Sequence, residues 1–227
     1  MKFALILTAA GIGKRIQTLI PKQFHTIKGK EIFLFTLERL TNFFAFDVIA
    51  ITYPEQHFKL MLQLLQKYQF NNIELIQGGN ERFHSVHNAL KNNKIKSSDF
   101  VFVHDAVRPF VSKDLLVRIY ENVLKFNAVA PGIPIKDTLK EIDNEGMIVR
   151  TIDRSNLVAI QTPQAFRTSL LLSAYEKAIN DGKIFTDEAG VVENFGHKVK
   201  FIEGEEVNIK ITTPNDLLYA EFLATNY

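Results

Sequence analysis

Short apolar runs alternate with longer amphipathic stretches along most of this chain. The apolar runs are rich in β-branched and aromatic residues, which predicts β-strands. These runs lie at 3–7, 48–53, 73–76, 100–103 and 128–135. The stretches between them have apolar residues at helical spacing, and helices are predicted at 31–44, 55–68, 82–90 and 115–124. This alternation predicts an α/β fold, namely a single Rossmann-like domain with a mostly parallel twisted sheet and helices on both faces.

The chain returns to the same alternation from residue 158 onward. The predicted elements are helices at 170–179 and from 185, and closing strands at 199–202 and 207–211. Thr212 or Thr213 stands ahead of Pro214, and proline is favoured at the first position of a helix. This pattern predicts a cap at one of the two threonines and a last helix that ends near Leu223.

Residues 136–155 break the alternation. They form two short strand-like runs around a turn at 144–146, which predicts a β-hairpin. A lone two-stranded ribbon is only marginally stable in water, so its apolar residues need a partner. We therefore expect an arm between subunits rather than a free flap, on one domain that spans 1–227.

The stretch 9–23, AAGIGKRIQTLIPKQ, follows the first predicted strand and has the composition of an anion-binding loop. Its small residues are Ala9, Ala10, Gly11 and Gly13, and its cations are Lys14, Arg15 and Lys22. Small residues let the backbone approach a ligand closely, and backbone N–H groups with cations suit a polyphosphate. An ordinary strand-to-helix turn with surface lysines is the alternative interpretation.

Two familiar phosphate motifs are excluded by spacing. A P-loop needs a glycine five positions before its Gly-Lys pair and Ser or Thr after it, and Thr8 and Arg15 occupy those places. A dinucleotide fingerprint needs its third glycine where Ile16 stands. The loop is therefore of another kind.

Composition excludes several other classes of protein. The net charge of +2 is too small for bulk binding to nucleic acid or to a membrane surface. The chain contains no cysteine, which rules out disulfides and thiolate metal sites. No apolar stretch approaches the roughly 18 residues that span a bilayer. We expect a cytoplasmic protein.

Three informative loops, 9–22, 78–85 and 105–110, follow predicted strands. Ligands of parallel sheets bind outside the carboxyl ends of the strands, so the three loops predict one site. Asp105 ends its strand and offers a hard oxygen ligand that suits Mg²⁺ bound to phosphates. A structural pair between Asp105 and Arg108 is an equally good interpretation.

Other polar residues give no clear indication of a functional site. Asp187 and Glu188 stand at a predicted helix start, where acids usually stabilise the helix dipole. His84 and His87 share a helix face but have no third metal ligand beside them, and His104 is expected to point to the side of its strand opposite Asp105.

Lys210 lies in the predicted strand 207–211. Alternation places it with Asn208 on one face of that strand. The pattern fits either plain amphipathic alternation or an anchor for a second substrate.

These pieces occur in an order that resembles a known family. The motifs are AAGIGKR, PKQF, GGNERFHSV, HDAVRPF, PIKDT, TPQAF, TDEA and NIKIT-x-PNDL, between residues 9 and 218. The chain resembles the 2-C-methyl-D-erythritol 4-phosphate cytidylyltransferases of the non-mevalonate isoprenoid pathway over nearly its whole length. The resemblance implies transfer of CMP from CTP to a polyol phosphate, with release of pyrophosphate and with Mg²⁺ or another divalent cation as cofactor.

The resemblance also implies site residues. The catalytic residues it implies are Arg15, Lys22, Arg154 and Lys210. The nucleotide-binding residues it implies are Ala9, Ala10, Gly11, Gly13, Lys22, Gly79, Ser85 and Ala106. The substrate-binding residues it implies are Asp105, Arg108, Thr138, Arg154, Thr162, Thr186 and Lys210, with Asp105 as the metal ligand. Thr138 and Arg154 lie on the arm, which in the family reaches the neighbouring subunit, so a homodimer with composite sites is expected.

Three alternatives remain at this point. Ribitol-5-phosphate cytidylyltransferases share the fold, the PKQF loop and much of the NIKITTP segment, but TDEA with Glu188 resembles the erythritol-phosphate branch better. A dinucleotide-dependent oxidoreductase is disfavoured by the missing third glycine. A non-catalytic nucleotide-binding regulator is disfavoured because Arg15, Lys22, Asp105 and Lys210 are all present.

Overall fold

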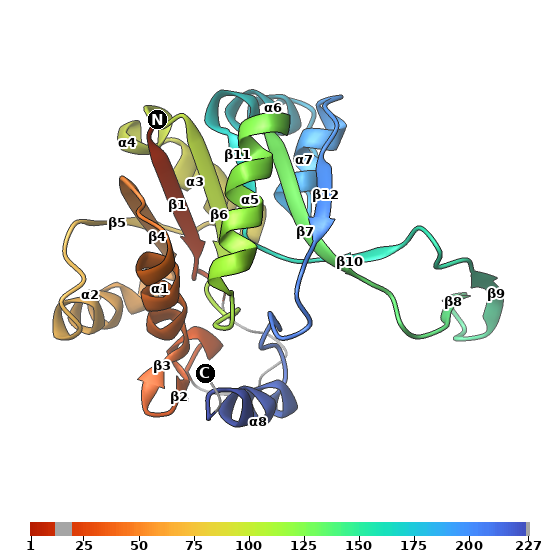
Figure 1. Ribbon diagram of the computed structural model, residues 1–227, viewed down its shortest axis with the longest axis horizontal. Helices are drawn as coiled ribbons and strands as arrows, with labels where there is room; N and C mark the ends of the chain where they lie inside the picture. Colours follow the sequence, from red (N-terminus) through yellow and green to blue (C-terminus); the bar gives the residue numbers. More distant parts are fainter. Residues whose placement is uncertain (12–19, 226–227) are drawn as a thin grey trace.

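A twisted sheet of eight strands runs through the residues that the computed structural model describes, 1–11 and 20–225 (Figure 1). The strand order is β10 (Val158–Ile160), β7 (Ala128–Pro134), β11 (Gln164–Arg167), β6 (Phe100–Asp105), β1 (Phe3–Thr8), β4 (Val48–Tyr53) and β5 (Ile73–Gln77), and β12 (Lys200–Glu203) pairs with β7. Strands β6, β1, β4 and β5 are parallel, as are β12 and β7. Strands β10 and β11 are antiparallel to their neighbours. The predicted mostly parallel α/β fold is confirmed.

The strands at the centre of the sheet are buried on both faces. In β1, Phe3, Leu5 and Leu7 face one core cluster, whereas Ala4 and Ile6 face another. Successive side chains of a strand point to opposite faces, so both faces need apolar residues when both are covered. The near-continuous apolar runs of the sequence follow from this double burial.

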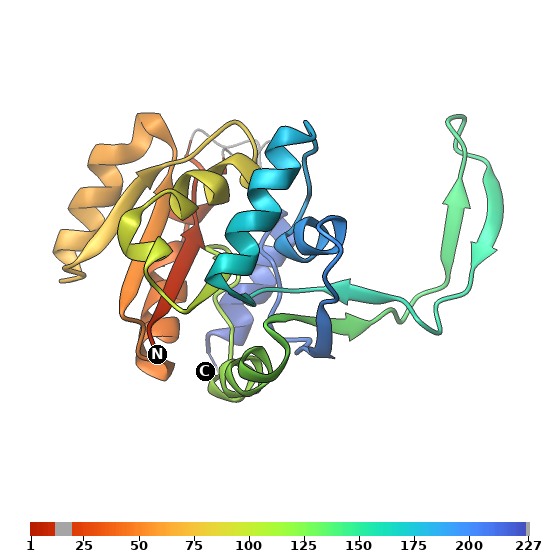
Figure 2. The ribbon, with the colours of Figure 1, turned by 90° about the horizontal axis from the view of Figure 1, so that it is seen from above.

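Two layers of helices cover the sheet (Figures 1 and 2). One cluster is closed by α1 (Ile32–Phe43), α2 (Phe58–Lys67) and α5 (Lys113–Phe126). The other is closed by α3 (Arg82–Leu90), α4 (Asn93–Lys96), α6 (Thr168–Asn180) and α7 (Glu188–Asn194). The smaller elements are η1 (Lys22–Phe24), η2 (Glu55–His57), β2 (Thr26–Ile27) and β3 (Lys30–Glu31). None of the helices in the described ranges has both the length and the apolar character needed to cross a membrane.

A third apolar cluster lies beneath the last helix, α8 (Pro214–Leu223). The predicted start of this helix is confirmed, because Thr213 caps it and forms a capping box with Asp216. The predicted strand at 207–211 is wrong. The backbone there bonds to loops rather than to a strand, since Ile211 N donates to Val107 O. The alternation still holds, because Val207, Ile209 and Ile211 belong to the third cluster.

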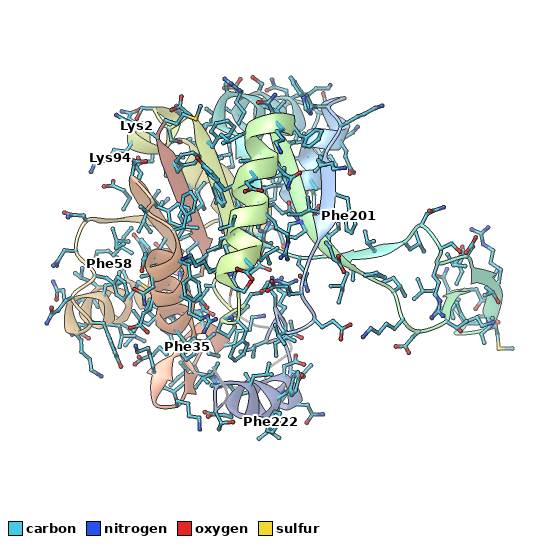
Figure 3. All side chains as sticks on the ribbon, viewed as in Figure 1. Lys2, Phe35, Phe58, Lys94, Phe201 and Phe222 are labelled. Atoms are coloured by element: carbon cyan, nitrogen blue, oxygen red, sulfur yellow. The ribbon has the colours of Figure 1, made fainter. Side chains whose placement is uncertain are left out.

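The hairpin at 136–155 projects from the body as a separate arm (Figures 1, 2 and 3). It pairs β8 (Leu139–Ile142) with β9 (Ile148–Ile152) around the predicted turn, in which Gly146 has φ +82°. Ile142, Met147 and Ile148 are 61–65% exposed. Such exposed apolar side chains are unusual on a two-stranded ribbon, which is only marginally stable alone in water.

Candidate active site

Two cavities open at the carboxyl ends of the central strands and share Arg82, Asp105 and Lys210. The larger, about 640 Å³, is lined by the ends of β1, β4 and β5 and by η1. The smaller, about 330 Å³, lies between β6 and the starts of β11 and α7. The loops 9–22, 78–85 and 105–110 therefore meet at one place, as the sequence predicted, within the parts of the chain that the structure describes.

The larger cavity collects most of the predicted nucleotide-binding residues. Those that line it are Ala9, Ala10, Gly11, Lys22, Gly79 and Ser85. Gln23 holds the two ends of the phosphate loop together, because its side-chain amide donates to Ala9 O at 2.6 Å and is almost completely buried. Gly13 and Arg15 lie outside the described residues.

Two glycines let the chain pass close to this cavity. A Cβ atom at Gly78 would lie 2.2 Å from Ala10 Cβ, and one at Gly79 would lie 2.4 Å from His84 Cβ. Gly79 N donates to Ser85 Oγ at 3.0 Å, which ties the loop to the first turn of α3. The loop therefore packs against Ala10 and the start of α3 more closely than any side chain at these two positions would allow.

Ala106 differs from the other predicted nucleotide-binding residues. It is fully buried and lines neither cavity, and its carbonyl oxygen accepts from Thr36 Oγ1 at 2.8 Å. Val107 lines the larger cavity in its place. The role of Ala106 is to anchor the loop behind Asp105.

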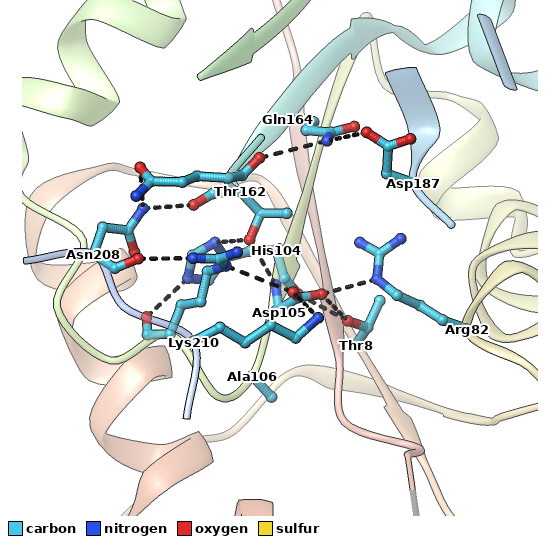
Figure 4. A network of polar contacts seen from close by, with 12 residues as sticks. Thr8, Arg82, His104, Asp105, Ala106, Thr162, Gln164, Asp187, Asn208 and Lys210 are labelled. Atoms are coloured by element: carbon cyan, nitrogen blue, oxygen red, sulfur yellow. Dashed lines mark hydrogen bonds and ion pairs between the residues drawn. The ribbon is translucent and has the colours of Figure 1, made fainter. Parts of the chain in front are cut away.

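Asp105 is surrounded by three cations, of which Arg82 and Lys210 are labelled in Figure 4. Its Oδ1 atom accepts from Arg82 Nε at 2.8 Å, and its Oδ2 atom lies 2.7 Å from Lys210 Nζ and 3.6 Å from Arg108 Nε. Burial alone would raise the pKa of Asp105, but the charges of Arg82, Lys210 and Arg108 outweigh burial and hold that pKa well below its usual range. Asp105 is therefore ionised, and it makes the structural pair with Arg108 that the sequence allowed.

Arg82 and Glu188 are the functional residues that sequence reasoning missed. Glu188 was predicted to stabilise a helix dipole only, and this is wrong. Its carboxylate is fully buried and accepts from Arg82 Nη1 at 2.7 Å and from Nη2 at 2.9 Å. Asp187 is the cap, because its Oδ1 accepts from Gly190 N. A signal existed in the sequence: Arg82 stands in the first turn of α3, where a cation opposes the helix dipole and needs another reason to be there.

His104 lines neither cavity, but it supports the site from behind. Thr162 Oγ1 accepts from Asp105 N at 3.1 Å, so its hydroxyl hydrogen is free to donate to His104 Nδ1 at 2.9 Å. His104 Nε2 then donates to Arg108 O at 3.1 Å. Burial is the main cause that lowers the pKa of His104 to about 4, so the ring is neutral.

This buried ring predicts a pH dependence of stability. The unfolded chain binds a proton at His104 below pH 6.5 and the folded chain does not until about pH 4, so stability falls as the pH falls through that window. The 6.5-to-4 shift corresponds to about 3 kcal/mol. Urea unfolding between pH 7 and 4 should show this loss in the natural protein and a shallower loss in His104→Gln. Equal slopes in the two proteins would contradict the assignment.

The smaller cavity collects the predicted substrate-binding residues of the domain body. Those that line it are Asp105, Arg108, Thr162, Thr186 and Lys210. The Thr162 hydroxyl already has two protein partners, so it orders the cavity wall from within. Asn208 supports the same wall, because its side-chain amide donates to Thr162 O at 2.9 Å and its main-chain carbonyl oxygen accepts from Arg108 Nη1.

Thr138 and Arg154 are not brought to either cavity of their own chain. Both are exposed on the arm, which projects away from the body (Figure 2).

The donor set at Asp105 fits one kind of metal site. Among the described residues there is no cluster of three or more His, Asp or Glu side chains that could enclose a metal. Mg²⁺ is commonly held by one or two carboxylates, with substrate phosphates and water as its other ligands. A single ionised carboxylate on the wall shared by both cavities suits such a cation, delivered together with a phosphate.

A mostly parallel sheet, with two cavities that meet at its strand ends at one carboxylate among three cations, is the arrangement expected of an α/β nucleotidyltransferase. The particular family is given by comparison. A family model described as IspD, 2-C-methyl-D-erythritol 4-phosphate cytidylyltransferase, matches residues 3–226, and the chain belongs to that family.

Individual relatives agree with the family. The chain is 40% identical over 222 residues to the 2-C-methyl-D-erythritol 4-phosphate cytidylyltransferase of Clostridium beijerinckii, covering 97% of both chains. Among solved structures, the enzyme of the same name from Francisella tularensis has a TM-score of 0.84 and 34% identity, over 98% of this chain and 99% of that one. A 4-diphosphocytidyl-2C-methyl-D-erythritol synthase from Anaerococcus prevotii has a TM-score of 0.84 and 31% identity, over 99% and 96%.

Proposed function

We propose that this chain transfers CMP from CTP to 2-C-methyl-D-erythritol 4-phosphate and releases pyrophosphate, as a step of the non-mevalonate isoprenoid pathway. The observation that carries the proposal is the meeting of two cavities at Arg82, Asp105 and Lys210. One cavity has a phosphate loop and suits a nucleoside triphosphate, and the other is cationic and suits a small phosphorylated polyol. The reacting phosphates would meet at the wall that the cavities share.

The nucleotide would lie in the larger cavity. Its cytosine and ribose would contact the loop around Gly79 and Ser85, and its phosphates would lie against Ala10, Gly11 and Lys22, which line the same cavity. The acceptor phosphate would enter the smaller cavity beside Arg108 and Lys210. This arrangement separates the two substrates except at the reacting atoms.

The chemistry is an in-line displacement at phosphorus. An oxygen of the acceptor phosphate attacks the α-phosphorus of CTP, the bond from that phosphorus to the bridging oxygen breaks, and pyrophosphate leaves with the bonding electrons. No covalent enzyme intermediate is required, so catalysis consists of positioning and charge stabilisation. Lys210 would hold the acceptor oxygen near the α-phosphorus, and Lys22, with Arg15, would stabilise the leaving pyrophosphate.

Asp105 would hold the divalent cation, Mg²⁺ or another. When bound, such a cation neutralises charge on the phosphate oxygens of CTP. The protein's part is to keep Asp105 ionised, which its three cationic neighbours do.

The arm supports a homodimer. Its apolar tip residues are 61–65% exposed, and Thr138 and Arg154 are remote from both cavities of their own chain. We infer that each arm packs on a second copy and places these two residues at that copy's acceptor cavity. The cytoplasm is the expected location for an enzyme that uses CTP.

The test is pyrophosphate release from CTP in the presence of Mg²⁺, with methylerythritol phosphate and ribitol 5-phosphate compared as acceptors. We expect release with methylerythritol phosphate and little above background with ribitol 5-phosphate. The hydroxyl pattern of the acceptor should decide this, because one unmet polar group in a buried site lowers reactivity strongly. Release with ribitol 5-phosphate alone would keep the mechanism and replace the substrate, and release with neither acceptor would refute the proposed function.

A further inference from the structure

The Arg82 side chain, on α3, links a carboxylate on α7 to a carboxylate at the end of β6. Its Nη1 and Nη2 atoms donate to the two oxygens of Glu188, and its Nε donates to Asp105 Oδ1. A bidentate pair between a guanidinium and a carboxylate fixes the plane and the direction of the guanidinium. Glu188 therefore determines where the Nε–H bond of Arg82 points.

Glu188 is itself firmly held. It is fully buried, and its Oε1 atom also accepts from the Tyr175 hydroxyl at 3.0 Å. Tyr175 is 1% exposed, and its ring stacks on Phe83 with centroids 4.7 Å apart. A buried carboxylate is costly unless it is paired and hydrogen-bonded, and a helix cap needs no such burial. Glu188 is built into the core, where it can define a position for Arg82.

The two oxygens of Asp105 have different surroundings. Oδ1 accepts from Arg82 Nε at 2.8 Å and from Thr8 Oγ1 at 3.2 Å, and Thr8 lies opposite Asp105 in the sheet register. Oδ2 has its close contact with Lys210 Nζ at 2.7 Å and a longer one with Arg108 Nε at 3.6 Å, and the Lys210 side chain is 36% exposed on the wall of both cavities. Lys210 can therefore turn toward a phosphate, whereas the partners of Oδ1 are fixed.

We infer that Glu188, supported by Tyr175, is a positioning residue that acts through Arg82 on Asp105. This arrangement reserves Oδ1 for the protein and leaves Oδ2 as the oxygen that takes a phosphate-bound divalent cation when Lys210 moves to the acceptor. This inference deepens the proposed function and rests on it, since it places CTP and a divalent cation at Asp105.

The negative charge of Glu188 has a second consequence at this position. Without it, the Arg82 guanidinium would pair with both oxygens of Asp105 or turn into the larger cavity toward the nucleotide phosphates. Either change would compete with a cation at Oδ2. The expected defect is therefore in the use of the divalent cation and in turnover, and not in recognition of the base.

The experiment compares Glu188→Gln with Glu74→Gln. Glu74 is also a hydrogen-bonded, ion-paired glutamate, but it contacts Asn92 and Lys94 near the opposite end of β5. In Glu188→Gln we expect kcat to fall and the Mg²⁺ concentration for half-maximal rate to rise, each about 10- to 100-fold, with KM for CTP changed less than about threefold. Glu74→Gln should leave all three values unchanged.

A second readout does not depend on turnover. Electron paramagnetic resonance of free Mn²⁺ measures how tightly Mn²⁺ binds to the protein saturated with CTP, and Glu188→Gln should weaken that binding about 10-fold. Folded Glu188→Gln protein with unchanged kcat, Mg²⁺ requirement and Mn²⁺ affinity would overturn the inference and leave Glu188 a purely structural residue.

Tyr175→Phe covers the case in which Glu188→Gln does not fold. It keeps the ion pair and removes one hydrogen bond, so we expect a shift of about threefold or more in Mn²⁺ affinity in the same direction. A lower melting temperature with unchanged Mn²⁺ affinity would contradict the inference. Failure of the proposed function looks different, because the natural protein would then bind Mn²⁺ and CTP but release no pyrophosphate with either acceptor.

Discussion

Replacement of Lys210 by alanine is expected to lower kcat for CMP transfer about 100- to 1,000-fold, the effect of removing one preorganised charge from a reacting centre. Lys210 is well placed for this effect, since it lines both cavities and its Nζ atom lies 2.7 Å from Asp105 Oδ2. Its part exposure lets it reach a phosphate oxygen without disturbing the core. The loss should appear mainly in kcat, because the stabilised charge develops during the reaction.

The measurement is steady-state pyrophosphate release, with Lys177→Ala as the matched control. Lys177 pairs with Asp181 on the surface of α6 and should be replaceable without loss of activity. The fold should survive in Lys210→Ala, because Arg82 and Arg108 still neutralise Asp105. Lys210→Ala protein with native circular dichroism and near-normal kcat would refute the catalytic role.

The fold could be predicted because local signals and burial agree. The bounds predicted for β4 and α3 match those observed, and α8 begins at the predicted cap. In each case the apolar period, the residues at the ends and the tertiary environment point to the same element. A prediction of this kind fails when a segment obtains its hydrogen bonds elsewhere.

Residues 207–211 are such a segment. Their alternation is that of a strand, but Arg108 Nη1 donates to Asn208 O and Ile211 N donates to Val107 O. Contacts to a loop a hundred residues earlier in the chain replace the ladder that a strand would need. A pattern of apolar residues reports which side chains are buried, and it does not report what the backbone bonds to.

The sequence predicted only those parts of the site that leave a local signal. Small residues and cations at strand ends are visible in a sequence, so the phosphate loop, Asp105 and Lys210 could be singled out. The bridge from Glu188 through Arg82 to Asp105 joins residues 23 and 106 positions apart, and no local pattern encodes such a contact. The buried position of Ala106 and the engaged hydroxyl of Thr162 also depend on the folded structure.

The second large effect is expected from the arm. Arg154→Ala should lower kcat/KM for methylerythritol phosphate about 100-fold, with KM for CTP little changed, because a lost charge partner of a bound phosphate costs a few kcal/mol. If Arg154 serves the other subunit, a dimer that combines Arg154→Ala with Lys210→Ala retains one intact site. In that dimer, one site carries both defects and the other carries neither.

Dimers of this composition can be isolated by co-expressing the two variants with different affinity tags and purifying on both. Their activity at low acceptor concentration should be about half that of the natural dimer, since one site of two is intact, although each variant alone is nearly inactive. Lys22→Ala paired with Lys210→Ala is the control, because both lysines line the same cavity of one chain and no intact site can form. Activity no higher than in this control would mean that Arg154 acts within its own subunit, and the intersubunit role of the arm would then be wrong.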